Sequence, residues 1–371
     1  MVCDLFEEGW PSMDLAAAGL LEHGAEMPGV ELECIRPRVP AAVSRVASPV
    51  SGASGLVRRW ARRVAIGGLR YGYYPRFASH LRGFDWFHVA DHSYAHLLSS
   101  LPPGRAGVYC HDIDAFRALI ETPKRAWSRV LAERTLKGLE RAQVVFHSTT
   151  AVRDELLQHR LVPEDRLVHA PYGIAAEFQS NARPADEQLA VKHPFVLNVG
   201  SLIPRKNPEF LLRVVGRVLR DRAELAFVQV GGSFTREQLD LLRDQGIEHR
   251  TRQLRGLSRA ELAAYYRRAG AVLLPSLAEG FGLPMVEALA CGTPVLASDI
   301  PAFREVGGDG AIYAKVESVD AWAELVHRML DGAGPDATTR AAVARRFSWN
   351  AHAATIVGAY SALDARGTPS A

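Results

Sequence analysis

The sequence predicts an α/β protein of two doubly wound, Rossmann-like domains with parallel sheets, and three observations support this fold class. Short apolar runs alternate with helical patterns along the whole chain, as in βαβ units. The 371 residues, 48% hydrophobic and 23% charged, suffice for two cores and exclude disordered, collagen-like and disulfide-stapled classes. Residues 178–192 are polar, contain Pro184 and lack apolar periodicity, which is typical of a linker.

In the first half, predicted strands alternate with predicted helices. The strands are expected at Val2–Leu5, Val30–Ile35, Trp86–Ala90, Gly107–Cys110, Val144–His147 and Leu167–Ala170. The helices are expected near Met13–Glu22, Val57–Leu81, Ala115–Arg141 and Ala151–Arg160.

After the linker the alternation restarts. The predicted elements are, in chain order, strand Phe195–Val199, helix Pro208–Leu219, strand Leu225–Val230, helix Arg236–Gln245, helix Arg259–Ala269, strand Ala271–Leu274, helix Pro284–Ala290 and strand Pro294–Ala297. We therefore place one domain at 1–182, a second at 183–346 and a C-terminal segment at 347–371. Because open α/β sheets bind ligands beyond the carboxyl ends of their strands, a central cleft faced by both domains is the expected site.

Charge and cysteine content restrict the partners and the compartment. A formal net charge of only +3 predicts no nucleic acid or other polyanion as partner. The cysteines (Cys3, Cys34, Cys110 and Cys291) lie far apart in the sequence without a CxxC pair, so reduced thiols are expected. The acidic start MVCDLFEEGW differs from a signal peptide, and no run approaches the ~20 apolar residues of a membrane span. We expect a cytoplasmic protein.

A loop with two glycines predicts an anion site in the second domain. Strand 271–274 is followed by the loop 279–282, and Pro284 begins the next helix. Glycines let the backbone approach a ligand, and the N–H groups of a helix N-terminus favour phosphate. Glu279 and Glu287 would repel a diphosphate, so we expect them to accept hydrogen bonds from hydroxyl groups. Phosphate and polyol hydroxyls together indicate a nucleotide-sugar.

A second loop of the same domain supplies positive charge. Strand 195–199 ends at Gly200, and Arg205 and Lys206 lie in the loop before the next helix. Fixed cations there stabilise the charge that develops on a departing diphosphate. Charge-assisted hydrogen bonds of this kind contribute roughly 1.5–3 kcal/mol each. Alone, such a pair is typical of a solvated loop, but its place at a strand end of this domain favours a functional role.

These segments resemble the nucleotide-sugar-binding domain of family 4 retaining glycosyltransferases, which have the GT-B fold of two Rossmann-like domains. The family's signature is two glutamates separated by seven residues, and Glu279 and Glu287 match it within EGFGLPMVE. The stretches VGSLIPRKN and EALACGTPVLASD are also similar to the family. The resemblance covers most of the chain and is strongest over 195–310.

The resemblance implies roles for the matching residues of the second domain. Arg205 and Lys206 would hold the diphosphate, with both counted as catalytic together with Glu279, which would bind the donor sugar hydroxyls. Glu287 would bind the ribose. The remaining donor-binding residues would be Gly200, Ser201, Gly280, Phe281, Gly282 and Leu283. Many members have arginine where this chain has Ser201, so Arg205 is expected to supply that charge.

In the first domain, the family often places a catalytic-site histidine after a strand. The sequence GVYCHD offers His111 together with Asp112. Asp91 and His92 end another predicted strand and are expected on the acceptor side. Members usually start with a full strand and a glycine-rich loop, whereas this chain begins within that strand and offers the single Gly9 there.

Patterns typical of other sites are weaker. Asp112 and Asp114 have the DxD spacing of metal-binding carboxylates, but they lie outside the nucleotide-binding half. His88, His92 and His96 have the spacing of zinc ligands on a helix, but His88 belongs to a predicted strand. The sequence has no GxGxxG and no P-loop, which disfavours a dehydrogenase. We expect no metal and no cofactor, with the nucleotide-sugar as a co-substrate.

The resemblance implies sugar transfer with retention at the anomeric carbon. The donor would be a nucleotide-diphosphate sugar, with GDP-mannose weakly favoured, and the acceptor a hydroxyl of a glycan or lipid-linked molecule in polysaccharide, lipopolysaccharide or glycolipid synthesis. The departing phosphate would help to deprotonate the acceptor, and closure of the domains would exclude water. The helix 347–363 would cross back to the first domain. A GT-B nucleotide-sugar epimerase and a non-catalytic nucleotide-sugar-binding protein remain alternatives.

Positive charge is concentrated in one segment, because residues 34–84 contain ten arginines and no acidic residue. Its centre, 56–82, predicts a helix with an apolar face and a basic face. The apolar face has Leu56, Val57, Trp60, Ala61, Val64, Ala65 and Leu69, and the basic face has Arg58, Arg59, Arg62, Arg63 and Arg70. One interpretation is a core-facing helix with a solvated basic side. The other is a surface that binds an anionic membrane, a lipid diphosphate or an acidic glycan, which would make the protein peripheral on the inner face of the plasma membrane.

Overall fold

The structure is a computed structural model that describes residues 1–9, 11–41, 43–44, 56–121, 126–179, 189, 191 and 193–367. The chain divides into two compact units, one formed by Met1–Tyr172 with Trp349–Ala371 and the other by Gly173–Ser348. The second unit thus begins at Gly173, before the boundary at 183 that we place from the sequence. Most of the predicted linker, 178–192, lies outside the described residues.

The first unit is built on a parallel sheet in the order β1-β2-β3-β4. Its strands are β1 (Phe87–Val89), β2 (Ala106–Cys110), β3 (Val144–His147) and β4 (Leu167–His169). Val2 extends the sheet by isolated parallel bridges to Val89 and to Ile35. The predicted strands at the N-terminus and at 30–35 are therefore reduced to single bridges among the described residues.

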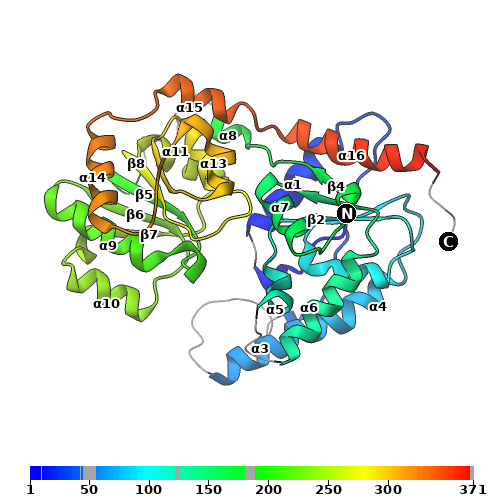
Figure 1. Cartoon of the computed structure of the whole chain (residues 1–371). Helices are drawn as coiled ribbons and strands as arrows, with labels where there is room; N and C mark the ends of the chain where they lie inside the picture. Colours follow the sequence, from blue (N-terminus) through cyan, green and yellow to red (C-terminus); the bar gives the residue numbers. More distant parts are fainter. Residues whose placement is uncertain are drawn as a thin grey trace. The chain divides into compact units, whose positions relative to one another are not determined.

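Helical segments cover this sheet (Figure 1). They are η1 (Phe6–Glu8), α1 (Pro11–Gly24), α3 (Leu56–Gly68), η2 (Leu69–Tyr73), α4 (Tyr74–Ala78), η3 (His92–Ser99), η4 (Asp114–Phe116), α5 (Arg117–Ile120), α6 (Ala126–Leu139), α7 (Thr150–Gln158), η5 (Glu164–Arg166) and α16 (Trp349–Ala365). The predicted helix at 57–81 is divided by the π-helical η2 into α3 and α4. The predicted helix at 115–141 is likewise divided among η4, α5 and α6, and residues 122–125 lie outside the described chain.

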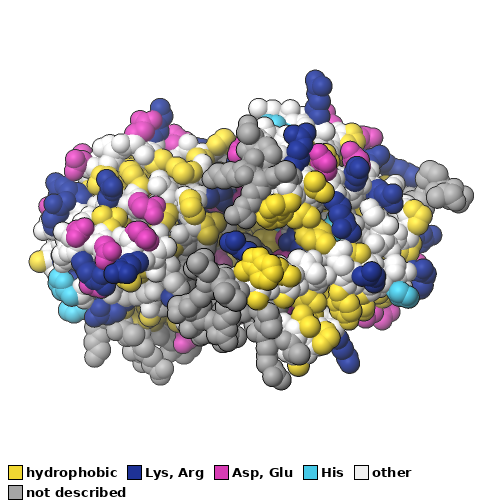
Figure 2. Space-filling model, turned by 90° about the horizontal axis from the view of Figure 1, so that it is seen from below, with side chains coloured by type: hydrophobic (Ala, Val, Ile, Leu, Met, Phe, Trp, Pro, Cys, Tyr) yellow, Lys and Arg dark blue, Asp and Glu magenta, His cyan; other side chains and the backbone are white. Residues whose placement is uncertain are grey.

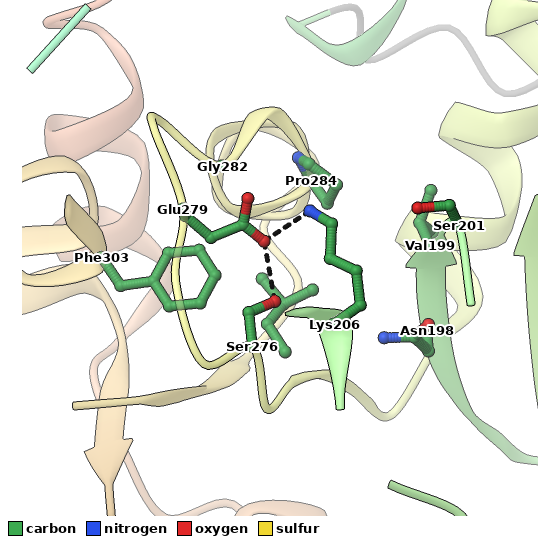
Figure 3. Close-up of a pocket in the computed structure, with 10 residues that line it drawn as sticks. Asn198, Val199, Ser201, Lys206, Ser276, Glu279, Gly282, Pro284 and Phe303 are labelled. Atoms are coloured by element: carbon green, nitrogen blue, oxygen red, sulfur yellow. Dashed lines mark hydrogen bonds and ion pairs between the residues drawn. The ribbon is translucent and has the colours of Figure 1, made fainter. Parts of the chain in front are cut away.

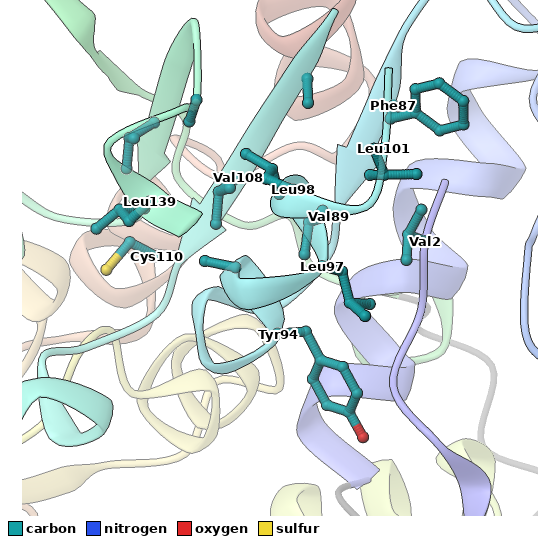
Figure 4. Close-up of a cluster of buried hydrophobic side chains, with 14 of the residues drawn as sticks. Val2, Phe87, Val89, Tyr94, Leu97, Leu98, Leu101, Val108, Cys110 and Leu139 are labelled. Atoms are coloured by element: carbon teal, nitrogen blue, oxygen red, sulfur yellow. The ribbon is translucent and has the colours of Figure 1, made fainter. Parts of the chain in front are cut away.

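The core of the first unit forms where η3 and the strands meet (Figure 4), with Tyr94, Leu97 and Val108 fully or almost fully buried. The C-terminal α16 packs on the same unit. Its Tyr360 hydroxyl lies 2.8 Å from Nδ1 of His88. A Cβ atom at Gly19 of α1 would come within 2.6 Å of the Trp349 ring, so glycine permits α1 and α16 to approach closely.

The second unit has a six-stranded parallel sheet in the order β10-β9-β8-β5-β6-β7. The strands are β5 (Phe195–Gly200), β6 (Ala226–Gly231), β7 (Thr251–Leu254), β8 (Ala271–Leu274), β9 (Val295–Ser298) and β10 (Ile312–Ala314). The helical segments are α8 (Ala176–Gln179), η7 (Pro204–Lys206), α9 (Pro208–Asp221), α10 (Arg236–Asp244), η8 (Glu248–Arg250), α11 (Arg259–Arg268), α12 (Leu283–Ala290), α13 (Pro301–Gly307), η9 (Gly308–Gly310), α14 (Val319–Leu330) and α15 (Ala337–Ala344).

The strand order creates a switch point between β5 and β8. From β5 the chain builds outward through β6 to β7, then returns to β8 on the other side of β5. Helices that leave these two central strands lie on opposite faces, so a crevice opens at their carboxyl ends. Within the described residues, no helix has the length and apolar character needed to cross a membrane.

Candidate active site

A pocket lies at the carboxyl ends of β5 and β8, at the switch point of the second sheet (Figure 3). It encloses about 280 Å³, part of which is open to solvent. Its lining residues are Asn198, Val199, Ser201, Lys206, Leu274, Ser276, Glu279, Gly282, Pro284 and Phe303. The amide of Asn198 joins the two strands, because its Nδ2 donates to the carbonyl of Leu273 at 2.7 Å.

A lysine and a glutamate meet inside this pocket. Nζ of Lys206 lies 2.5 Å from Oε1 of Glu279, and the hydroxyl of Ser276 donates to the same oxygen at 2.7 Å. The Glu279 side chain is only 7% exposed, whereas that of Lys206 is 23% exposed. The pocket therefore has the Glu279 carboxylate deep in its wall and the Lys206 ammonium nearer its mouth. The sequence predicts each residue as part of the site but does not predict their contact.

The loop before α12 brings backbone close to the pocket. Gly282 is the N-cap of α12 and has a φ of 98°, a conformation that favours glycine. There is also no space for a side chain at this position, because a Cβ atom would lie 2.6 Å from Cε1 of Phe303. No side chain caps this helix end. The N-terminus of α12 therefore presents its positive dipole end beside Glu279 and Lys206, which suits an anionic group.

Glu287 occupies a different environment from Glu279. It lies on the buried side of α12, where Oε2 accepts a hydrogen bond of 2.8 Å from the hydroxyl of Tyr266 on α11. Burial raises the pKa of Glu287 to about 7, although Tyr266 and Arg259 act in the opposite direction. Glu287 is not among the described residues that line the pocket.

This raised pKa predicts that Glu287→Gln stabilises the protein at alkaline pH. Below the ordinary pKa of 4.5 the carboxyl is neutral in both the folded and the unfolded chain, so it costs nothing. Between pH 4.5 and about 7 only the unfolded chain ionises, and the wild type loses stability as pH rises. At 1.36 kcal/mol per pKa unit, the rise from 4.5 to about 7 corresponds to a loss on the order of 3 kcal/mol above pH 7.

Thermal unfolding of both proteins at pH 5 and pH 8 checks this prediction. We expect Glu287→Gln to raise Tm clearly at pH 8 and only slightly at pH 5. Glu317→Gln is the matched control, because Glu317 is 76% exposed and should leave Tm unchanged at both pH values. An equal effect of Glu287→Gln at the two pH values would contradict the burial of an ionisable carboxyl there.

Of the other residues predicted to bind the donor, some line the pocket and others do not. Ser201 lines it, whereas Gly200 ends β5 with a φ of 143° and accepts a hydrogen bond from the N–H of Gly232 at 3.0 Å. Arg205 belongs to η7, and its carbonyl accepts from the N–H of Leu277 at 2.8 Å. Gly280, Phe281 and Leu283 belong to the loop and first turn of α12.

Three lining residues were not singled out from the sequence: Asn198, Ser276 and Phe303. A polar Asn198 inside an otherwise apolar strand was the one available signal, because buried amides need partners. Ser276 lies close to Glu279 in sequence, but only the loop geometry directs its hydroxyl to that carboxylate. Phe303 comes from α13, and nothing in its local sequence indicates the pocket.

In the first unit, the predicted acceptor-side residues form one polar cluster. Nδ1 of His92 lies 3.2 Å from Oδ1 of Asp91, and its Nε2 lies 3.5 Å from Oδ1 of Asp112. Burial alone would raise the pKa of Asp91, but His92, His111 and Arg70 outweigh it and lower that pKa to about 2. Asp91 is therefore a carboxylate that stays ionised at neutral pH despite its burial.

His111 is buried beside this cluster. Its Nε2 lies 2.8 Å from the carbonyl of Ala90, and its Nδ1 contacts the hydroxyl of Tyr172. Burial lowers the pKa of His111 despite the nearby Asp91, so the imidazole is neutral at neutral pH. Asp114, the second carboxylate of the DxD pattern, pairs with Arg117 at 2.5 Å. Among the described residues, no group of three or more His, Cys, Asp or Glu side chains is placed to hold a metal ion.

Two further groups accompany this cluster: Asp4, which the sequence did not single out, and the half-buried Arg70 of η2. Burial and the neighbouring Asp91 carboxylate raise the pKa of Asp4 to about 9. Arg70 lies 3.1 Å from Glu8 and donates to the carbonyl of Ser93. Arg70 was predicted on the solvated basic face, and that prediction is wrong, because its guanidinium lies against the ring of Tyr94 inside the unit. Gly9 ends η1 with a φ of 71°.

The chain is similar to known glycosyltransferases, most clearly in its second unit. Residues 180–346 match the family described as glycosyl transferases group 1. The O-antigen chain mannosyltransferase B of Escherichia coli is 28% identical over 274 residues, which cover 70% of this chain and 71% of that enzyme. A D-inositol 3-phosphate glycosyltransferase of Kineococcus radiotolerans is 31% identical over 266 residues, covering 62% of this chain and 59% of that enzyme.

Solved structures share the fold at low identity. Sucrose-phosphate synthase from Thermosynechococcus elongatus has a TM-score of 0.71 at 19% identity, covering 97% of this chain and 94% of that chain. HepE from Anabaena in complex with UDP-glucose has a TM-score of 0.64 at 17% identity, covering 84% of this chain and 90% of that chain. These likenesses identify the GT-B fold, as the sequence predicts.

Proposed function

We propose that this chain, a transferase that carries a glycosyl transferases group 1 domain in a GT-B fold, moves a sugar from a nucleotide-diphosphate sugar to a hydroxyl acceptor with retention at the anomeric carbon. The observation that carries the proposal is the pocket between β5 and β8, where Lys206 and Glu279 meet beside the N-terminus of α12. A cation, a carboxylate and a helix N-terminus match the diphosphate and the hydroxyls of such a donor.

The donor's diphosphate would take the ammonium of Lys206 away from Glu279. Glu279 would then accept hydrogen bonds from sugar hydroxyls, while Ser276 keeps that carboxylate oriented. As the bond between the anomeric carbon and the phosphate oxygen breaks, negative charge grows on the phosphate, and Lys206 with the α12 dipole stabilises it. We assign Arg205 to stabilising the same negative charge on the diphosphate. We assign Glu287, on the buried face of α12, to binding the ribose.

For the acceptor, we propose the polar cluster of the first unit. Asp91 and Asp112 flank His92, and His111 is neutral, so the cluster offers carboxylate oxygens that can accept hydrogen bonds from a hydroxyl-bearing molecule. We do not assign Glu279 as a nucleophile, because it keeps the hydrogen bond from Ser276 and is assigned to the sugar hydroxyls. We therefore propose that the leaving phosphate accepts the acceptor's proton on the same face of the sugar.

The donor sugar and pathway are narrower proposals. The mannosyltransferase relative supports a mannosyl donor, and HepE holds UDP-glucose in its own structure, so GDP-mannose and UDP-glucose are the first donors to test. By the same likeness to an O-antigen enzyme, we propose an acceptor in polysaccharide or glycolipid synthesis. Incubation without an acceptor distinguishes the two enzyme classes. A transferase then only hydrolyses the donor slowly, whereas an epimerase converts the donor to its epimer.

A donor screen tests the proposed function. Purified protein is incubated with GDP-mannose, UDP-glucose, ADP-glucose or dTDP-glucose, with and without a mixture of hydroxyl acceptors. The products are separated by chromatography against standards of the nucleotides, the donors and their epimers, because epimers have the same mass. We expect nucleoside diphosphate release that depends on one donor and increases with acceptor. Conversion of a donor to its epimer without acceptor, or no turnover of any donor that binds, would refute glycosyl transfer.

We also propose that the first unit binds anionic membranes through a surface of α3 and α6. Trp60 and Val64 on α3 are 68% and 53% exposed, and Trp127 and Val130 on α6 are 57% and 61% exposed. The first interpretation of this helix predicts that Trp60 and Val64 face the core, and their exposure contradicts it at these two positions. Ala65 and Leu69 of the same predicted face do pack in the core. Leu56, Val57, Arg58 and Arg59 lie outside the described side chains.

Basic residues accompany these exposed rings. Arg63 is exposed one position before Val64, and Arg134 of α6 donates to the carbonyl of Tyr71 in η2, which brings α6 next to the end of α3. Figure 2, seen from the side on which α3 and α6 lie in Figure 1, shows apolar and basic side chains interspersed on the first unit. Aromatic rings beside arginines suit the interface of an anionic bilayer.

Vesicle sedimentation tests this surface. We expect the wild type to bind vesicles rich in phosphatidylglycerol but not pure phosphatidylcholine, and Trp60→Ala with Trp127→Ala to weaken binding at least about tenfold, since each buried ring contributes roughly 1.5–3 kcal/mol. Leu277→Ala is the control, because Leu277 is 54% exposed but belongs to the second unit. Unchanged binding in the double variant would exclude this surface.

A further inference from the structure

Two of the four cysteines come together in the first unit although 31 positions separate them in sequence. The Sγ atoms of Cys3 and Cys34 lie 3.2 Å apart, and both cysteines are free. A disulfide bond has an S–S length of about 2.03–2.05 Å, so the two sulfurs need to approach by only about 1.2 Å to become bonded. The other two cysteines are engaged elsewhere, since Cys110 donates to the carbonyl of Asp112 and Cys291 to that of Phe178.

The backbone around this pair is held firmly. Val2 and Ile35 form a parallel bridge, and the N–H of Cys3 donates to the carbonyl of Ile35 at 3.1 Å. The buried hydroxyl of Tyr74 contacts the carbonyls of both Cys3 and Ile35, at 2.7 and 3.1 Å. The two thiols are therefore presented to one another by main-chain hydrogen bonds and one tyrosine, and their proximity does not depend on a flexible loop.

The two thiols differ in accessibility and in charge environment. Cys34 is exposed, whereas Cys3 is 1% exposed. The hydrogen bond with Cys3 lowers the pKa of the Cys34 thiol, against the effect of its partial burial, and the Arg36 guanidinium lowers it further. The accessible sulfur is thus the one with thiolate character, and the buried sulfur lies behind it.

We propose that Cys3 and Cys34 form a reversible, oxidant-reactive thiol pair in which Cys34 reacts first and Cys3 closes the bond. The expected oxidant is a low-molecular-weight disulfide. The Cys34 thiolate attacks one of its sulfurs, forming a mixed disulfide and releasing one thiol. Cys3 then loses its proton and attacks the Cys34 sulfur, forming the Cys3–Cys34 bond and releasing the second thiol. Two electrons pass from the two protein thiols to the reagent.

The bond would connect two segments beside the acceptor-side cluster. Cys3 precedes Asp4, whose pKa responds to Asp91, and Cys34 lies two positions before Arg36, which pairs with Asp14 of α1. The link would close a loop that spans positions 3 to 34 and restrict the unfolded chain, so oxidised protein should unfold at a higher temperature. This inference does not depend on the proposed glycosyl transfer.

Oxidised glutathione is the probe for the experiment. Full-length protein is incubated with it, quenched in acid, alkylated and analysed by peptide mass spectrometry. We expect the wild type to yield a Cys3–Cys34 cross-linked peptide, lighter by two hydrogen atoms than the two reduced peptides, with no lasting glutathione adduct and a Tm several degrees higher. Dithiothreitol should reverse both changes.

Variants separate the two steps. Cys3→Ser should accumulate a glutathione adduct on Cys34, Cys34→Ser should leave Cys3 reduced, and Cys291→Ser in the second unit should behave as the wild type. The proposal is overturned if wild-type Cys34 keeps the glutathione adduct without closing on Cys3, or if Cys34 reacts no faster than Cys291. Because the wild type alone gives either result, the test stands even if a variant fails to fold.

Discussion

Lys206→Ala lowers kcat/KM for sugar transfer by about a hundredfold or more, the loss seen when one preorganised charge-stabilising group is removed from a reacting oxygen. Lys206 lines the pocket between β5 and β8. Under the proposed function, the charge on the departing diphosphate would grow beside its ammonium. The substitution also removes the cation beside the buried Glu279 and leaves it the hydrogen bond from Ser276. Because a buried carboxylate without its cation is destabilising, we expect a modest fall in Tm. Steady-state kinetics with the accepted donor checks the first effect.

Two further variants make this result specific. Lys315→Ala removes an exposed lysine of the same unit, 74% accessible, and should keep wild-type kinetics. Lys206→Arg retains a positive charge and should recover part of the activity. Near wild-type kcat/KM in folded Lys206→Ala would show that the pocket's cation does not act on the reaction.

Glu279→Gln lowers kcat/KM by about tenfold to a hundredfold. The amide keeps the shape of the side chain but loses its charge, and hydrogen bonds to a charged acceptor are stronger than those to a neutral one by roughly 1–2 kcal/mol. Glutamine also brings an NH2 group into a position now filled by an oxygen that faces Lys206 at 2.5 Å. We therefore expect KM for the donor to rise as well as kcat to fall.

The control for this variant is again an exposed residue of the second unit. Glu317→Gln lies outside the pocket and should leave both constants unchanged. If Glu279→Gln raised KM without lowering kcat, Glu279 would bind the donor equally in the ground and transition states. If neither constant changed, the carboxylate would have no role in donor recognition.

The sequence was most informative where burial is complete. Strands such as β5 and β8 are continuous apolar runs because both faces of a central parallel strand are covered, and the predicted ranges lie within one or two residues of the observed ones. The edge strand β7 was not predicted, because its sequence Thr-Arg-Gln-Leu is polar and half exposed. The predicted N-terminal strand is reduced to Val2, with its two isolated bridges, and no local sequence pattern distinguishes such a bridge residue from a full strand.

The charged residues of the pocket between β5 and β8 could be predicted from the sequence, but the contact between Lys206 and Glu279 could not. Glycines and a proline before a helix, followed by glutamate, have local physical meanings, so Glu279 and Gly282 were accessible from sequence. The contact of Lys206 with Glu279 joins residues from two loops that only the β5–β8 neighbourhood brings together. The burial of Glu287 against Tyr266 likewise depends on how α11 and α12 pack.

Helical periodicity was misleading for α3. Trp60 and Val64 share a helix face, which predicts burial, yet both are exposed. Arg70 from the opposite predicted face is half-buried. The π-helical η2 begins at Leu69, so a single 3.6-residue period does not run through 56–81 and Arg70 departs from the phase of α3. Trp60 and Val64 precede η2, so this change of phase does not explain their exposure. The contact between Cys3 and Cys34 is equally inaccessible to spacing rules, because a parallel bridge creates it.

Titration calorimetry with nucleoside diphosphates and monophosphates tests the donor pocket most directly. UDP, UMP, GDP and GMP are titrated into wild type, Lys206→Ala and Lys315→Ala. A diphosphate site predicts that one diphosphate binds the wild type and Lys315→Ala at least tenfold more tightly than its monophosphate, about 1.4 kcal/mol, and that this difference disappears in Lys206→Ala. Equal preference for the diphosphate in all three proteins would contradict the assignment of Lys206 and of the pocket between β5 and β8.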